Sequence, residues 1–157
     1  MHTDYPEPGS PEDWLRYARS DLEIARVTRS GDMLLEGLCF HAQQTAEKSL
    51  KAVLLSMKIP FPRTHSIRRL LDLLPATLAI PDTVQESAIL TDYAVTVRYP
   101  GEVEPVEQEE YEQALRIAEQ ILKWAEQMLE KQTAAQEEAQ ASSDASICDH
   151  DINSNHR

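Results

Sequence analysis

Residues 40–55 read FHAQQTAEKSLKAVLL, and they form the centre of the longest helical pattern that also carries histidine and lysine side chains. Apolar residues recur at intervals of three and four across this region: Leu35, Leu38, Ala42, Ala46, Leu50, Val53 and Met57. This spacing places them on one face of a helix. Ala42 and Ala46 are small enough to let a second helix approach closely. We therefore predict a long helix over residues 33–58, which Pro60 and Pro62 end.

Helical patterns also occur before and after this segment. Ser10, followed by Pro11 and two acids, predicts a helix that runs to about Arg29 with an apolar stripe of Trp14, Ala18, Leu22 and Ala25. Ser66 can cap a short helix that reaches Leu74, where Pro75 stops it. Tyr17, Tyr111 and Trp124 also lie in helical stripes, so we expect core packing for them.

The second half of the chain contains a further helix and a clear terminal one. Asp82 and Gln85 resemble a capping box for a helix that ends near Pro100. The last helix is predicted from one repeating face: Tyr111, Leu115, Ala118, Leu122, Ala125 and Leu129. After about Lys131 this pattern is lost. We therefore expect an all-α fold, an antiparallel up-down bundle of four to five helices.

The 157 residues are divided by the same patterns. We predict an N-terminal extension (1–10), one helical domain (11–131) and a disordered acidic tail (132–157), because the tail is too polar to bury a core. A disulfide between Cys39 and Cys148 is not expected. The sequence shows no signal peptide and no apolar run of about 20 residues, so we expect a cytoplasmic protein.

The net charge of -12 is unevenly distributed along the chain. Residues 40–70 contain six lysines and arginines against Glu47 alone, for a net charge of +5. Every other part of the chain is acidic. A general coat for nucleic acid is therefore excluded, whereas phosphate can be attracted to this one basic segment.

Several short motifs resemble those of the HEPN family. They are FHAQQTAEKSLKA at residues 40–52, THSI at 64–67 with Leu70 and Leu71, and RYP at 98–100. The resemblance covers about residues 12–130 and implies a small helical bundle that is usually a homodimer. It also implies a link to nucleotide or RNA chemistry. The implied partner is a minimal nucleotidyltransferase, in a toxin–antitoxin or phage-defence pair of genes.

The same resemblance bears on catalysis. Many HEPN proteins are metal-independent ribonucleases that use an arginine followed, after four to six residues, by a histidine. Arg98 matches the arginine, but the histidine positions hold Val103, Glu104 and Pro105. RNA cleavage benefits from a general base as well as a cation. We therefore expect no enzymatic activity, and we expect neither a cofactor nor a metal.

The candidate binding residues come from three places. The spacing of His41, Gln44, Lys48 and Lys51 puts them on one helical face. Arg63 and His65 lie in the following loop, and Arg98 with Tyr99 can hold a phosphate and stack a base. Each group also has a purely structural alternative. The helix face can be an ordinary solvated surface supported by the Gln44–Lys48 and Glu47–Lys51 pairs. His65 can cap the next helix, and Arg98 can pair with nearby acids.

Three functions follow from these residues. The first is a homodimeric, non-catalytic protein that binds a nucleotide or a nucleotidyltransferase partner. The second is a ribonuclease with a non-standard site around Arg98. The third is an interaction scaffold whose dimer interface is its purpose.

Overall fold

The computed structural model describes residues 9–96, 101 and 104–148, and in this part of the chain every regular element is helical. The elements are α1 (Pro11–Ala25), α2 (Leu35–Ser56), α3 (Ile67–Asp72), α4 (Asp82–Glu86), the 3₁₀ helix η1 (Ser87–Asp92), α5 (Tyr93–Thr96) and α6 (Gln108–Cys148). Among these, none has the length and apolar composition needed to cross a bilayer. The predicted all-α class is confirmed.

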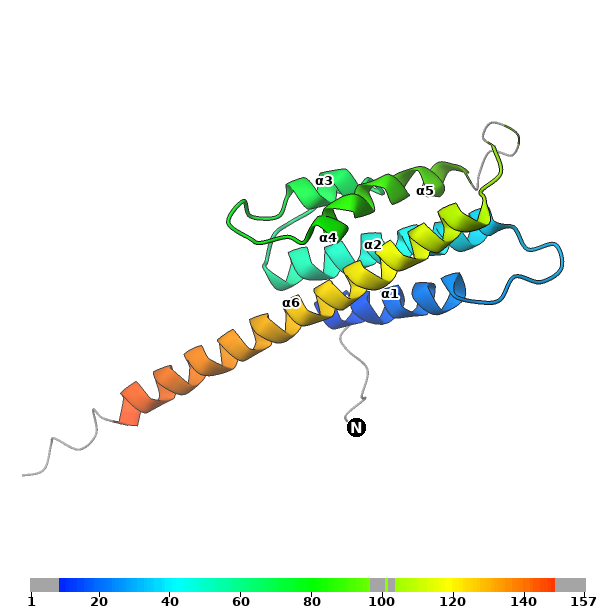
Figure 1. Ribbon diagram of the computed structural model, residues 1–157. Coiled ribbons are helices and arrows are strands. Elements are labelled where there is room, and N and C mark those ends of the chain that lie inside the picture. The colour runs from blue at the N-terminus through cyan, green and yellow to red at the C-terminus, as the bar shows by residue number, and fades with distance from the viewer. Residues whose placement is uncertain (1–8, 97–100, 102–103, 149–157) are drawn as a thin grey trace, which may run out of the picture.

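Two pairs of neighbouring segments run in opposite directions: α1 and α2, and the segment from α4 to α5 and α6 (Figure 1). Helices α1 and α2 run antiparallel, the segment from α3 to α5 covers a second side of α2, and α6 returns along the bundle. Helix α2 is central because it contacts α1, α3, η1, α5 and α6. The antiparallel bundle predicted from the apolar stripes is therefore present.

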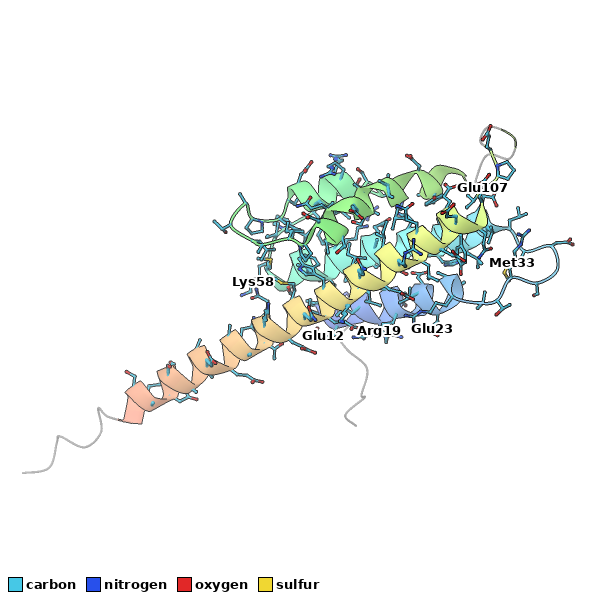
Figure 2. All side chains as sticks on the ribbon, viewed as in Figure 1. Glu12, Arg19, Glu23, Met33, Lys58 and Glu107 are labelled. Carbon is cyan, nitrogen blue, oxygen red and sulfur yellow. The ribbon has the colours of Figure 1, made fainter. Side chains whose placement is uncertain are left out.

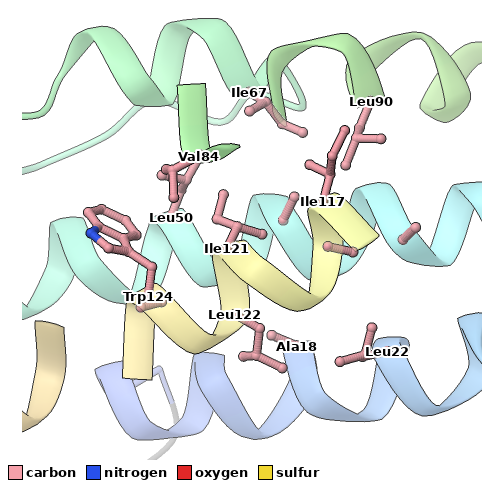
Figure 3. Close-up of a cluster of buried hydrophobic side chains, with 14 of the residues drawn as sticks. Ala18, Leu22, Leu50, Ile67, Val84, Leu90, Ile117, Ile121, Leu122 and Trp124 are labelled. Atoms are coloured by element: carbon pink, nitrogen blue, oxygen red, sulfur yellow. The ribbon is translucent and has the colours of Figure 1, made fainter. Parts of the chain in front are cut away.

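The core lies where α2 and α6 meet the other elements (Figure 3). Leu50 of α2 and Ile121 of α6 are fully buried, and Val84 packs into the same cluster from α4. Burying one such side chain contributes roughly 1.5–3 kcal/mol. The predicted burial of Trp124 is confirmed, whereas Tyr17 is 50% exposed and does not belong to the core.

Helix α1 begins as predicted and ends earlier. The Ser10 hydroxyl accepts a hydrogen bond from the Asp13 backbone N–H at 3.1 Å, which confirms the cap. The helix stops at Ala25 and does not reach Arg29. There the Tyr111 hydroxyl of α6 donates to the Ala25 carbonyl. A contact from a distant part of the chain thus satisfies one of the free carbonyls at the helix end.

The end of α2 has the Schellman geometry. The N–H of Ile59 donates to the Leu54 carbonyl at 2.9 Å, and the N–H of Lys58 donates to the Leu55 carbonyl at 3.0 Å. Lys58 has a φ of 58°, in the left-handed region that glycine prefers. The helix is therefore closed by backbone hydrogen bonds before Pro60 is reached.

The helix predicted from Asp82 to Pro100 is interrupted by a 3₁₀ segment in the part that the structure describes. The structure divides its described part into α4, η1 and α5. The capping box was wrong, because Pro81 is the N-cap and Asp82 already lies inside the helix. In η1 the buried Ser87 hydroxyl donates to the Val84 carbonyl at 2.6 Å, and Thr91 accepts from the Ile67 N–H at 3.2 Å. The Ser87 bond is of the local side-chain to backbone kind that competes with regular α-helical bonding.

Helix α6 continues well past Lys131, where the sequence predicted a disordered tail. It reaches Cys148, and residues 133–147 are all exposed. Figure 1 shows this extension leaving the bundle without a neighbouring element. The loss of the apolar pattern marks the end of packing rather than the end of the helix. Alanine, glutamine and glutamate, which dominate residues 132–141, have high helix propensity and continue it.

Candidate functional site

The polar side of α2 is organised around two buried carboxylates. The Asp21 cluster consists of Asp21, His41 and Lys48, and the Glu47 cluster consists of Glu47, Gln43, Gln44, Lys51 and His65. Asp21 is 7% exposed and Glu47 is 3% exposed. Buried charges are stable only when they are paired, so each carboxylate determines where its partners lie.

The Asp21 cluster joins α1 to α2. The Nδ1 of His41 lies 2.9 Å from one carboxylate oxygen of Asp21, and the ammonium of Lys48 donates to the other. The Lys48 ammonium also lies 5.8 Å from the centre of the Tyr17 ring, within the range of a cation–π contact. Lys48 is therefore held against α1 instead of extending freely into solvent.

The Glu47 cluster occupies the same turns of α2, at positions that alternate with those of the Asp21 cluster. Lys51 donates to Glu47 at 2.7 Å, and the side-chain amide of Gln43 donates at 2.9 Å. The Nδ1 of His65 lies 3.1 and 3.3 Å from the two carboxylate oxygens. The amide of Gln44 donates to the Gln43 oxygen at 2.7 Å and completes the network.

The environment of Glu47 keeps this carboxyl group ionised. Burial raises the pKa of Glu47, but the hydrogen bonds from Lys51, Gln43 and His65 and the charge of Lys51 outweigh burial. The net result is a pKa below its usual value. Hydrogen-bond donors and a nearby cation explain this direction, because all of them stabilise the charged form.

Lys51 is shielded from solvent by aromatic rings as well as by Glu47. Its ammonium lies 5.4 Å from the centre of the Trp14 ring and 5.8 Å from that of Phe61. The two rings meet edge to face at 6.2 Å. The side chain of Lys51 is 9% exposed, so its ammonium interacts mainly with Glu47 and the two rings and little with solvent.

His65 differs from the rest of the Glu47 cluster because its side chain is 64% exposed. An ionised carboxylate only accepts hydrogen bonds, so Nδ1 is the nitrogen that carries the proton. The Nε2 edge is then left for solvent or a ligand. Three arginines in the same stretch are also exposed: Arg63, Arg68 and Arg69. A buried acid thus orients an exposed imidazole in a stretch of the chain that also carries exposed arginines.

Comparison with known proteins identifies the family. A profile of the HEPN domain matches residues 11–128. The chain belongs to the HEPN domain family. Its fold is similar to TT1696 from Thermus thermophilus, with 32% identity over 77% of this chain and 99% of that one and a TM-score of 0.65. It is also similar to ST0689, an archaeal HEPN homologue, with 32% identity, coverage of 76% and 98%, and a TM-score of 0.59. Comparison with curated proteins gives no match.

The structure of this HEPN domain brings together most of the predicted binding residues, but in two groups. His41 and Lys48 meet at Asp21, while Gln44, Lys51 and His65 meet at Glu47. The predicted Glu47–Lys51 pair is confirmed. Gln44 contacts Gln43 and Glu47 rather than Lys48. The cap of α3 is Ser66, whose hydroxyl accepts from the Arg69 N–H, and not His65.

Two predicted residues of the HEPN motifs, Arg98 and Tyr99, lie outside the described residues. Two residues that organise the site were missed by the sequence analysis: Asp21 and Gln43. Asp21 had a detectable signal, because it lies on the apolar stripe of α1 between Ala18 and Ala25. An acid at such a position predicts a partner on the neighbouring helix.

The buried thiol of this HEPN domain is not a reactive group. Cys39 is fully buried, and burial, with Glu110 and Glu36 nearby, raises its pKa to about 12. A thiol with this pKa stays protonated at neutral pH and is a poor nucleophile. Within the described residues, no group of three or more acidic, histidine or cysteine side chains is arranged to hold a metal ion.

Proposed function

We propose that this HEPN protein is a non-catalytic binding module that holds a nucleotide at the exposed edge of the Glu47 cluster. The observation that carries the proposal is His65, which a buried carboxylate orients while 64% of its side chain stays exposed. Arg63 is exposed two positions earlier in the chain. Imidazole and guanidinium groups are suited to phosphate oxygens, and a fixed orientation lowers the entropic cost of binding.

The charge distribution supports a phosphate-bearing ligand at this position. Residues 40–70 carry a net +5, while the whole chain carries -12. Lys48 and Lys51 are already paired with Asp21 and Glu47. We therefore expect His65 and Arg63 to contact the ligand, and Lys48 and Lys51 to stabilise the buried carboxylates.

Titration calorimetry with ATP and with GTP tests this proposal. We expect saturable binding, and we expect His65→Ala and Arg63→Ala each to weaken it about tenfold, because each removes a charge-assisted contact. Lys131→Ala is the matched control, since Lys131 is an exposed cation outside the site. No heat with either nucleotide, or an equal loss in the control, contradicts nucleotide binding and favours the scaffold.

We also propose that the chain forms a homodimer, since HEPN domains are known to dimerise. A specific observation supports protein contact: four large apolar side chains are exposed near the connection from α1 to α2, namely Ile24, Val27, Met33 and Leu34, at 40%, 41%, 37% and 62%. Exposed apolar groups gathered in one region often mark an interface. Light scattering at micromolar concentration tests the dimer, and a monomer contradicts it.

The proposed protein partner is a minimal nucleotidyltransferase of a toxin–antitoxin or phage-defence pair. Membership of the HEPN family supports it. Co-expression of the two chains, followed by affinity purification and size-exclusion chromatography, tests the complex. Separate elution of the two chains at micromolar concentration contradicts it.

A further inference from the structure

The hydrogen bonds of His65 define which of its two ring nitrogens carries a proton. The Nδ1 atom lies 3.1 and 3.3 Å from the two carboxylate oxygens of Glu47. Because an ionised carboxylate only accepts hydrogen bonds, the proton of the neutral ring is on Nδ1. The Nε2 atom makes no hydrogen bond within the described part of the chain. In the neutral ring it is therefore an open acceptor on a side chain that is 64% exposed.

An open acceptor is the wrong partner for a phosphate group. Phosphate oxygens accept hydrogen bonds, so two lone pairs would face each other if the imidazole stayed neutral. A second proton makes both ring nitrogens donors, with Nδ1–H toward Glu47 and Nε2–H toward the phosphate. Histidine is the side chain whose charge normally changes between pH 5 and pH 8, so this proton is available near neutral pH.

The charge balance of the Glu47 cluster favours uptake of that proton when a phosphate arrives. Lys51 donates to Glu47 at 2.7 Å, and the other members of the cluster besides His65 are neutral amides. The cluster is thus neutral as long as His65 is neutral. A bound phosphate adds negative charge, and a nearby opposite charge favours the charged form of an imidazole.

The other charged groups close to His65 in the chain or on neighbouring elements are mostly basic. Lys58 lies where α2 ends and the loop to α3 begins (Figure 2). Thr91 of η1 contacts the start of α3 and is followed by an acid. These charged groups are all exposed: Lys58 and Arg63 in the loop, Arg68, Arg69 and Asp72 on α3, and Asp92 at the end of η1. The excess of cations disfavours an extra proton on His65 until a phosphate neutralises them.

We propose that nucleotide binding at the Glu47 cluster is coupled to the uptake of one proton by Nε2 of His65, so that the site binds more tightly as the pH falls from 8 to 6. This inference rests on the proposed function and adds its regulation. The solvent supplies the proton when the nucleotide binds and receives it when the nucleotide leaves. No bond of the nucleotide is broken.

Titration calorimetry with ATP at several pH values tests the coupling. We expect the natural chain to bind ATP at least about fivefold more tightly at pH 6 than at pH 8. His65→Gln retains a hydrogen-bond donor but does not titrate, so its affinity should change much less. The phosphates of ATP titrate equally in both experiments, so the difference between the two proteins reports on His65.

A matched control separates His65 from histidine in general. His41 also contacts a buried carboxylate, that of Asp21, but it belongs to the other cluster. We expect His41→Gln to retain the pH dependence of the natural chain. Circular dichroism and thermal melting verify that both variants are folded at each pH.

The proton can also be counted directly. Calorimetry at pH 7 in two buffers with different enthalpies of ionisation gives the number of protons taken up on binding. We expect the natural chain to take up more protons per ATP than His65→Gln does, because an imidazole gains charge only in the natural chain.

The possible failures are distinguishable. If ATP and GTP do not bind at any pH, the proposed function is itself contradicted, and the coupling with it. If ATP binds with the same pH dependence to the natural chain and to His65→Gln, the coupling alone is overturned. If binding to the natural chain alone weakens toward pH 6, the coupling is also overturned, and the result indicates that neutral Nε2 accepts from a hydroxyl or amino group of the nucleotide.

Discussion

Glu47 is a buried acid whose neighbours depend on it for their positions. Replacing it with glutamine leaves the ammonium of Lys51 largely buried without a counter-charge. We expect Glu47→Gln to lower the free energy of unfolding at pH 7 by about 3 kcal/mol, the usual cost of breaking a buried pair. Urea denaturation measures this, and the exposed Glu138→Gln is the control.

The same residue predicts a pH dependence. The pKa of Glu47 is lower in the folded chain than in the unfolded one, where it is about 4.3. The contribution of ionised Glu47 to the free energy of unfolding is therefore complete above about pH 4.3. It is lost as the pH falls through the pKa that Glu47 has in the folded chain. We therefore expect the free energies of unfolding of the natural chain and of the Glu47→Gln variant to differ less at pH 3 than at pH 7. A difference that stays constant between pH 7 and pH 3 contradicts this account.

Lys58 is a position where a substitution is expected to stabilise the protein. Its φ of 58° is left-handed, which is unfavourable for a residue with a Cβ atom. We expect Lys58→Gly to stabilise the protein by about 0.5 kcal/mol, after the larger conformational entropy of glycine in the unfolded chain is subtracted. Lys58→Ala should give no such gain. Equal urea midpoints for the glycine and alanine variants would show that the backbone is not strained here.

At the scale of the element, the end of α1 depends on a hydroxyl group of α6. Tyr111 is 8% exposed, and its hydroxyl donates to the Ala25 carbonyl. We expect Tyr111→Phe to cost about 1–2 kcal/mol, because a buried acceptor loses its donor. The control is Tyr17→Phe, which changes an exposed ring and should be neutral. Thermal melting compares the two, and equal effects would argue against a special role for Tyr111.

The extension of α6 gives a second prediction for an element. Residues 133–147 are exposed, so deleting 132–157 removes helix but little packing. We expect the free energy of unfolding to change by less than about 0.5 kcal/mol, as for surface changes in general. The far-ultraviolet dichroism should fall. A large loss of stability after the deletion would mean that this segment packs on the domain or on a second copy.

The sequence predicted the long helices well because each has an apolar face that continues over many turns. The stripes of α2 and α6 are almost entirely buried, as the spacing of Leu50 and Leu122 indicated. Shorter features were harder to predict. In η1, the Thr91 hydroxyl accepts a hydrogen bond from the Ile67 N–H at the start of α3, a contact between distant residues that no local pattern encodes. Likewise, the face of α2 looked solvated because its partner Asp21 belongs to α1.

At the scale of the whole molecule, the exposed apolar residues near the turn between α1 and α2 predict where the proposed dimer forms. Val27 and Leu34 are 41% and 62% exposed. We expect Val27→Glu combined with Leu34→Glu to convert the dimer to a monomer at micromolar concentration, because charges are then buried without partners at the interface. Sedimentation measures the change. An intact dimer places the interface elsewhere.

Finally, the packing of Trp14 on Lys51 gives the protein an internal optical reporter. The indole lies 5.4 Å from an ammonium whose counter-ion is Glu47. Its emission therefore depends on the local electric field and changes when that counter-ion is protonated or displaced. Trp124 is the other tryptophan of the chain and is buried in the core. In a Trp124→Phe variant, fluorescence would follow the Glu47 cluster alone, without any attached dye.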